Sequence, residues 1–259
     1  MLPALQIIPT ALLGQYLAAW PGGALAAFDA LQDADLSTDD FSFYTSVASV
    51  FSSKIEGENI DLDSYVQHKR FGAPYQPDYT RKVDDLYEAY QYAQNHTLTP
   101  STLAEAHKIL SRHLLPTSQQ GRLRNQHMYI TTADGRIEYV ATAPTEVATQ
   151  MQLFFADLEA LIAEPLAIPE AFFFASMLHL VFVKIHPYAD GNGRTARLLE
   201  KWFLAAMLGP KAWFLPAERY YYEQHSTYYA NLRALGLEDQ SLDYGKALPF
   251  LVMLPAGLK

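Results

Sequence analysis

The sequence predicts an all-α protein that carries one small β-hairpin. Through most of the chain, apolar residues recur three and four positions apart, a spacing that places them on one face of a helix. The exception is residues 126–141, where two short β-prone runs flank Ala133, Asp134 and Gly135. These two observations together indicate a helical protein with a single hairpin.

Helix start signals support several of the expected helices. Thr99 is a good N-cap residue, and Pro100 after it suits the first helical position. Pro144 and Pro169 also stand where a helix could begin. The expected helices span residues 24–33, 38–56, 62–69, 79–95, 100–114, 145–164, 168–186, 191–208, 216–235 and 243–253.

We see no internal repeat and no long linker, so we expect an N-terminal extension over residues 1–75, and the core with the C-terminal helices over residues 76–259. Residues 1–28 are mostly apolar, and the first charged residue is Asp29. No basic segment precedes this run, and prolines and glycines interrupt it, which argues against a signal peptide. It also lacks the roughly 18 uninterrupted apolar residues of a membrane span. We therefore expect an irregular arm docked on the core of a cytoplasmic protein with no membrane partner. Such an arm could also bury a homodimer interface.

The composition excludes several classes of site. The chain has 259 residues, no cysteine and a net charge of −9. Without cysteine there are no disulfides and no thiolate metal sites. Nucleic-acid binding usually needs a basic face. The acidic balance therefore argues against a nucleic-acid partner.

The expected helix over residues 38–56 ends at an unusual position. Ser37 and Thr38 suit its start, and Gly57 suits the position just after its end. This places Glu56 in the last turn, where the helix dipole disfavours an acid. Glu56 is therefore either a solvated side chain or the partner of a cation elsewhere in the protein.

The most informative stretch is residues 184–197, Lys-Ile-His-Pro-Tyr-Ala-Asp-Gly-Asn-Gly-Arg-Thr-Ala-Arg. Apolar helical patterns lead into it and out of it, so it predicts two helices joined by a polar loop. Gly191, Asn192 and Gly193 then stand at the start of the second helix. Free backbone N–H groups and the positive end of the helix dipole make this a natural anion site.

Polar side chains around this loop fit phosphate chemistry. Arg194 and Arg197 share a helix face, and guanidinium groups suit phosphate. Asp190 is a hard oxygen ligand for an ion such as Mg²⁺, and His186 can take a proton from a hydroxyl. His179 and His186 are seven positions apart and have no third ligand in sight, so we do not expect zinc. A helix–turn–helix corner explains any one of these residues, but it needs neither the histidine nor the paired arginines.

Two motifs resemble those of Fic-domain proteins. His186 to Arg197 resembles the family signature His-Pro-Phe-x-Asp/Glu-Gly-Asn-Gly-Arg-x-x-Arg, with Tyr188 in place of the phenylalanine. Residues 52–57, Ser-Ser-Lys-Ile-Glu-Gly, resemble the family's inhibitory motif Ser/Thr-x-x-x-Glu-Gly/Asn. The motifs occur in the order expected of proteins whose inhibitory helix precedes the Fic core. The resemblance covers roughly residues 40–235.

This resemblance implies a Fic-type helical bundle in which the hairpin is the flap that holds a segment of the target protein by strand addition. It implies transfer of AMP from ATP, with Mg²⁺ or Mn²⁺, to a Tyr, Thr or Ser hydroxyl of that target. His186 would deprotonate the hydroxyl, and Asp190 would hold the metal ion on the phosphates. Arg194 would neutralise phosphate charge, while Gly191, Asn192 and Gly193 would cradle the anion.

The inhibitory motif implies autoinhibition. Arg197 would hold the γ-phosphate, and Glu56, with Ser52 at the start of its motif, would occupy that arginine and block the nucleotide. Tyr228 and Tyr229 are candidates for the walls of an adenine site, and equally for core aromatics. Three alternatives stay open: an enzyme that removes AMP or works in both directions, another nucleotide or phosphocholine donor, and a nucleotide-sensing module without catalysis.

Overall fold

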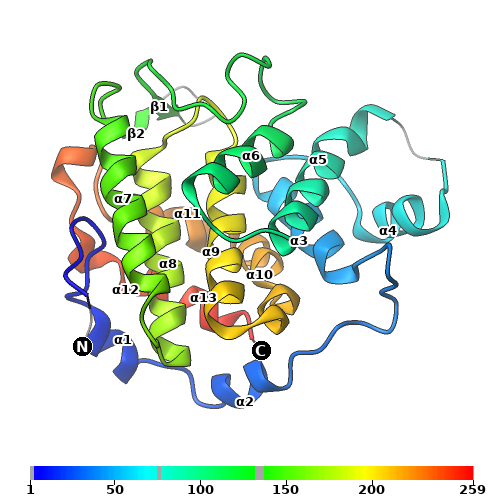
Figure 1. Cartoon of the computed structure of the whole chain (residues 1–259), viewed down its shortest axis with the longest axis horizontal. Helices are drawn as coiled ribbons and strands as arrows, with labels where there is room; N and C mark the ends of the chain where they lie inside the picture. The colour runs from blue at the N-terminus through cyan, green and yellow to red at the C-terminus, as the bar shows by residue number, and fades with distance from the viewer. Residues whose placement is uncertain (1–2, 75–76, 132–136, 259) are drawn as a thin grey trace.

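The computed structural model describes residues 3–74, 77–131 and 137–258, and this part of the chain is a bundle of helices with a two-stranded sheet at one end (Figure 1). The fold class expected from the sequence is confirmed. The helices are α1 Leu13–Ala18, α2 Ala24–Asp29, α3 Phe43–Ile55, α4 Leu62–Phe71, α5 Pro77–Gln94, α6 Pro100–Leu110, α7 Val147–Ile162, α8 Ile168–Ile185, α9 Asn192–Leu208, α10 Ala217–Glu223, α11 His225–Arg233, α12 Leu248–Leu251 and α13 Met253–Ala256. The strands are β1 Tyr129–Thr131 and β2 Ile137–Val140, and 3₁₀ helices span Pro210–Phe214, Asp239–Ser241 and Tyr244–Lys246.

The centre of the bundle is α8, which packs most extensively against α9 and also contacts α1, α7, α12 and α13. Neighbours surround α8, so it is apolar on all sides. In the described residues it is the one helix long and apolar enough to cross a membrane. However, 78% of that stretch is buried inside the protein, as in the core helix of a soluble fold.

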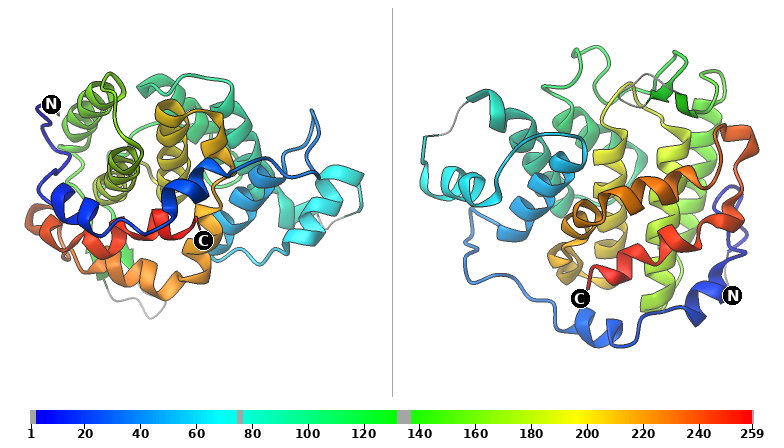
Figure 2. Two further views of the ribbon diagram at one scale, coloured as in Figure 1. Left: turned by 90° about the horizontal axis from the view of Figure 1, so that it is seen from below. Right: turned by 180° about the vertical axis from the view of Figure 1, so that it is seen from behind.

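The N-terminal arm is docked on this core, as expected. Its backbone N–H groups at Gln6, Ile7 and Ile8 donate to the buried carboxylate of Asp157 in α7, over 2.7–2.9 Å. The expectation of a wholly irregular arm is wrong, because α1 and α2 form within it and bury Tyr16 and other apolar side chains. Figure 2 shows the arm running beside the C-terminal helices. Side chains from both sides of residue 75 share one hydrophobic core.

Helix α3 begins later than residue 38. Thr38 and Phe41 exchange two backbone hydrogen bonds in a tight turn, and Ser42 has an extended backbone and accepts a hydrogen bond from the N–H of Thr45 at 3.2 Å. Ser42 is therefore the N-cap, in place of the expected Ser37 or Thr38. The end of the helix agrees with the sequence, because Gly57 has φ 91°.

Several other helix bounds differ from expectation. Residues 216–235 form two helices, since Gln224 leaves helical geometry at φ −104° and ψ 29°. Residues 243–253 break into a 3₁₀ turn and short helices, because Pro249 cannot donate a backbone hydrogen bond there and neither can Pro255 just beyond. Thr99 caps α6 as expected, through the N–H of Thr102.

The hairpin is present but short. β1 and β2 pair antiparallel, with Ile130 opposite Tyr139. The other edge of β2 is covered, because the N–H of Val140 donates to the carbonyl of Leu237 at 2.7 Å. Among the described residues the outer edge of β1 pairs with no other strand, so it is the edge left for a further one. The expected turn at residues 133–135 lies outside the described residues.

Candidate active site

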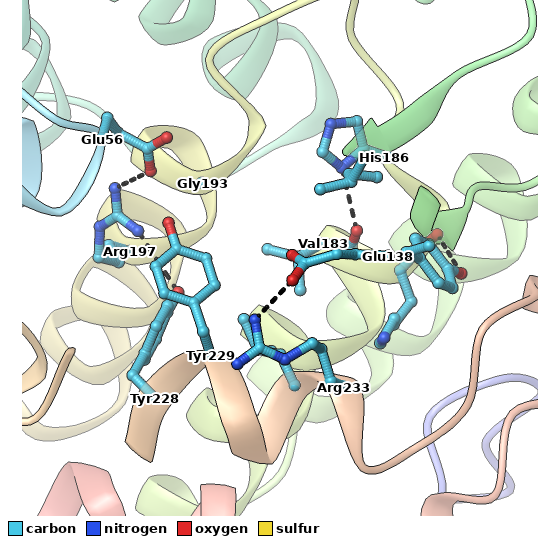
Figure 3. Close-up of a pocket in the computed structure, with 13 residues that line it drawn as sticks. Glu56, Glu138, Val183, His186, Gly193, Arg197, Tyr228, Tyr229 and Arg233 are labelled. Carbon is cyan, nitrogen blue, oxygen red and sulfur yellow. Dashed lines mark hydrogen bonds and ion pairs between the residues drawn. The ribbon is translucent and has the colours of Figure 1, made fainter. Parts of the chain in front are cut away.

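A pocket opens where the C-terminal end of α8, the N-terminal end of α9, the hairpin and α11 meet. Figure 3 shows Glu56, Arg197 and Tyr229 on one side of the opening, with His186 and Val183 on the other. The structure thus brings both sequence motifs to one cavity.

His186 is held in an uncommon backbone conformation that aims it at this cavity. It ends α8 with φ 54° and ψ 59°, and no other non-glycine residue in the described part has a positive φ. Such a conformation costs about 1–3 kcal/mol and concentrates at functional sites. The ring Nδ1 lies 3.2 Å from the carbonyl oxygen of Val183. A carbonyl only accepts, so Nδ1 carries the proton and Nε2 keeps a free lone pair. Burial lowers the pKa of His186 to about 4, so the ring is neutral at pH 7.

The loop from His186 to α9 closes on itself. Asn192 accepts from the N–H of Tyr188 and donates to its carbonyl, both over 2.8 Å. Gly191 caps the helix with φ 78°, and a side chain there would also press on Leu110. The side-chain amide of Asn192 is therefore already hydrogen-bonded within the loop. Only its backbone N–H group is left to contact an anion.

Arg197 is the best-bonded cation of the site and is only 1% exposed. Its Nη2 lies 2.6 Å from the Oε1 of Glu56 and 3.1 Å from the carbonyl of Ser52. Its Nε donates to the Ser52 hydroxyl at 2.8 Å, and its Nη1 to the Tyr228 hydroxyl at 3.3 Å. Burial by itself would raise the pKa of Glu56, but the charges of Arg197 and Arg194 outweigh it and lower that pKa. Glu56 is therefore ionised and paired at neutral pH.

Gly193 makes room for this pair. A Cβ at that position would collide with the Oε1 of Glu56 and stand 3.2 Å from the Nη1 of Arg197. The glycine at the start of α9 is therefore required by the close approach of the glutamate.

Arg194 also faces an acid from the segment after α3. Its Nη2 lies 3.5 Å from the Oε1 of Glu58, which accepts a shorter bond of 2.7 Å from Lys82. The Nε of Arg194 is buried and has no hydrogen-bond partner in the described part of the chain. Both motif arginines thus meet a glutamate from the same short segment.

Tyr228 and Tyr229 both line the pocket but differ in their bonding. Tyr228 is buried, and its hydroxyl links Arg197 to the Nε2 of His179 at 2.9 Å. The Nδ1 of His179 lies 3.2 Å from Glu200. Tyr229 is half-buried, and its hydroxyl donates to the carbonyl of Ile55 at 3.4 Å. Tyr228 is thus anchored by polar contacts, and Tyr229 is the freer of the two aromatic walls.

Two positioning residues were missed by sequence reasoning. Arg124, only 6% exposed, donates to the carbonyls of Ile185, His186, Gln126 and Thr142, so it ties the motif loop to both ends of the hairpin. The sequence offered only its place in the run before the hairpin.

His107 also holds the loop between α8 and α9 in place. Its ring stacks on Tyr188 with centroids 3.6 Å apart. Its Nδ1 accepts from the N–H of Gly121 and its Nε2 donates to the carbonyl of Asp190, each over 2.9 Å. Nothing in the local sequence around His107 indicates this role, because all three partners lie elsewhere in the chain.

Asp190 fits a magnesium ion shared with a ligand. Its carboxylate is exposed at the mouth of the loop, and its Oδ1 accepts from the N–H of Gly191 at 2.6 Å. In the described residues no three His, Cys, Asp or Glu side chains cluster in a way that could hold a metal alone. A single hard carboxylate beside an anion site matches Mg²⁺, which takes its remaining ligands from phosphates and water.

The fold and the site together define a helical protein in which one pocket brings together a neutral histidine, the N-terminal end of a helix and a buried arginine. Residues 97–204 match the model of the Fic/DOC family. The chain is 31% identical over 124 residues to "Protein adenylyltransferase Fic" of Nematostella vectensis, a match that covers 46% of this chain and 27% of that protein. The chain therefore contains a Fic-family domain, and it spans about a quarter of the length of this curated relative.

Solved structures agree on the fold. A Fic family protein from Desulfovibrio desulfuricans G20 superimposes with a TM-score of 0.75 at 21% identity, covering 99% of this chain and 74% of that one. Fic-1 (residues 134–508) from C. elegans gives a TM-score of 0.68 at 19% identity, covering 96% and 70%. At these identities the likeness concerns the fold alone.

Proposed function

We propose that this protein transfers AMP from ATP to a hydroxyl group of a target protein, and that Glu56 restrains the reaction. The observation that carries the proposal is the pocket itself. One side of the pocket carries the neutral imidazole of His186 with its free Nε2. The opposite side carries the N-terminal end of α9 and the buried guanidinium of Arg197. The relative from Nematostella vectensis supports the choice of AMP through its name.

The chemistry follows from these groups. The Nε2 of His186 accepts the proton of the target hydroxyl as its oxygen bonds to the α-phosphorus. The bond from the α-phosphorus to the bridging oxygen breaks, and pyrophosphate leaves with that electron pair. The free N–H groups at the start of α9 and the guanidinium of Arg197 stabilise the phosphate charge. Mg²⁺ or Mn²⁺ held by Asp190 would neutralise further charge on the phosphates.

Glu56 restrains this reaction by occupying Arg197. The guanidinium is one of the few groups placed to receive the end of the triphosphate, and at 2.6 Å it is already paired. Without Arg197 the triphosphate lacks an anchor, and the α-phosphorus is not held in line with the hydroxyl. Glu56 therefore restrains the reaction by preventing the productive positioning of the triphosphate.

The target is expected to dock on the outer edge of β1, where a strand can still be added. A target segment docked there would be the protein partner of the proposed reaction, with its hydroxyl next to His186.

The test is to incubate the chain with α-labelled ATP and a cell lysate, with wild type beside Glu56→Gly. The proposal expects labelled proteins with the variant and few with wild type. Glu146→Gly is the matched control, since Glu146 is exposed, makes no side-chain capping bond, and glycine suits an N-cap. No labelled protein from either chain, across several lysates and with added Mg²⁺ or Mn²⁺, would contradict the proposal.

A further inference from the structure

Lys184 is a buried cation that makes no ion pair in the described part of the chain. Its side chain is in the last turn of α8, only 4% exposed, and it lines the pocket that holds His186 and Arg197. Its Nζ lies 4.1 Å from the centroid of the Tyr139 ring. Across the described part of the chain it makes no hydrogen bond or ion pair through that Nζ. Burial lowers the pKa of Lys184 to about 8, against the opposing charge of Asp239.

A buried ammonium group without an ion pair contrasts with another buried lysine, Lys201. Lys201 is equally buried, at 2% exposed, and its Nζ makes an ion pair of 2.7 Å with Glu218. Burying an ammonium group without a partner costs stability, so such groups are normally paired. A favourable interaction with the C-terminal dipole of α8 would offset only part of that cost.

We propose that Lys184 is a ligand-binding residue, whose ammonium group donates hydrogen bonds to acceptor atoms on the nucleobase of a bound nucleoside triphosphate. The inference rests on the proposed function for the nature of the ligand. The phosphates are placed by the start of α9 and by Arg197, on one side of the pocket (Figure 3). Lys184 lines the same pocket, together with Tyr139, Val183 and Leu232. The apolar surface of these three side chains beside a donor group suits the flat faces and polar edge of a base.

The donor chemistry also gives a preference among bases. An ammonium group has three donors and no acceptor. Guanine offers two adjacent acceptors, O6 and N7, on one edge, whereas adenine offers N7 beside an amino donor. Lys184 therefore contributes more to the binding of GTP than to that of ATP, and nothing to the binding of a phosphate chain that lacks a base.

The test compares Lys184→Met with its parent, in the wild-type chain and in the Glu56→Gly chain, by calorimetric titration. The ligands are GTP, ATP and inorganic tripolyphosphate, each with Mg²⁺. Methionine keeps the length of the side chain and removes the charge. We expect about a tenfold loss of GTP affinity and a smaller loss for ATP, with tripolyphosphate unchanged. The melting temperature should stay equal or rise, because an unpaired buried charge is gone. Lys246→Met, on an exposed lysine near the C-terminus, should change none of these values.

Equal affinities for GTP in Lys184→Met and its parent would overturn the inference, and so would an equal loss for tripolyphosphate. A lower melting temperature with unchanged affinity would make Lys184 a structural cap of α8 and would also overturn it. If Lys184→Met does not fold, acylation of lysines in the unmutated chain decides the matter. GTP should protect Lys184 and leave Lys246 reactive, and lack of protection at saturating GTP counts against the proposal.

These measurements follow binding and involve no transfer. A chain that binds through Lys184 but modifies no protein contradicts the proposed transferase function alone. A chain that transfers AMP with unchanged nucleotide affinity in Lys184→Met contradicts this inference alone.

Discussion

The carboxylate of Glu56 and the guanidinium of Arg197 lie 2.6 Å apart, although 141 positions separate them in the chain. The pair joins the end of α3 to the second turn of α9. Arg197 is buried, whereas the side chain of Glu56 is 28% exposed and borders the pocket. A glutamate that is partly open to solvent can leave, and the arginine it releases stays in place through Ser52 and Tyr228.

Glu56→Gly should therefore raise modification of protein targets by at least tenfold, because Arg197 becomes free to position the triphosphate. Its free energy of unfolding should fall by only about 1–3 kcal/mol, since other hydrogen bonds still hold the arginine. Transfer of label from ATP and urea denaturation measure the two effects. Adding Arg197→Ala should remove the gain. Equal transfer by Glu56→Gly and wild type at saturating ATP would rule out the restraint.

His186→Ala, made in the Glu56→Gly chain, should lower transfer at least a hundredfold, because the variant lacks the imidazole that takes the hydroxyl proton in the proposed mechanism. ATP affinity should stay within about twofold, since the imidazole does not hold the phosphates in the proposed pose. Rates of label transfer and calorimetric titration separate the two. His96→Ala, at an exposed histidine, is the control. Transfer at the parent rate would remove His186 from the mechanism.

The buried imidazole of His107 should make the stability of the folded protein depend on pH. Burial lowers its pKa to about 4 in the folded protein, whereas a histidine in an unfolded chain has a pKa of about 6.5. Between these values the unfolded chain binds a proton that the folded chain does not. The stability that His107 contributes is therefore fully present above about pH 6.5 and is lost as the pH falls toward 4.

The expected loss from this group is about 2 kcal/mol between pH 7 and pH 5. His107→Gln does not titrate, yet its amide can still accept from Gly121 and donate to Asp190. Urea denaturation at the two pH values should show wild type losing more stability than the variant. The same loss in both proteins would mean that His107 is not held neutral by the fold.

The proposed docking of the target on the hairpin can be tested at the outer edge of β1. Ala141 donates to the carbonyl of Met128, so the alternation of an antiparallel ladder turns the N–H of Ile130 toward β2 and that of Tyr129 away from it. Tyr129→Pro removes a donor from the outer edge and leaves the hairpin paired. Modification of the target should fall while ATP affinity is kept.

Ile130→Pro is the comparison, because it removes a donor within the ladder and should disturb the hairpin itself. Target modification by Tyr129→Pro equal to that of its parent would show that the target does not dock by strand addition.

The sequence by itself determined the local features of this protein. The glycines at 191 and 193, the loop between α8 and α9 and the cap at Thr99 depend on backbone preferences and spacing within a few residues. The same holds for the hairpin and for the end of α3 at Gly57. The helix dipole also marked Glu56 as an acid that is either solvated or paired with a cation, and it could not distinguish the two.

Only the tertiary structure decided what depends on distant partners. The pairing of Glu56 with Arg197, the support of Asp190 by His107 and the anchoring of the arm by Asp157 join residues from 83 to 151 positions apart. The motif resemblance already implied the first of these pairings. The other two leave no local signal, because His107 and Asp157 are unremarkable in their own segments. The burial of Lys184 without an ion pair among the described residues belongs to the same class. Whether a polar group is paired, solvated or left facing a pocket is set by the elements packed around it, and those elements come together only in the folded chain.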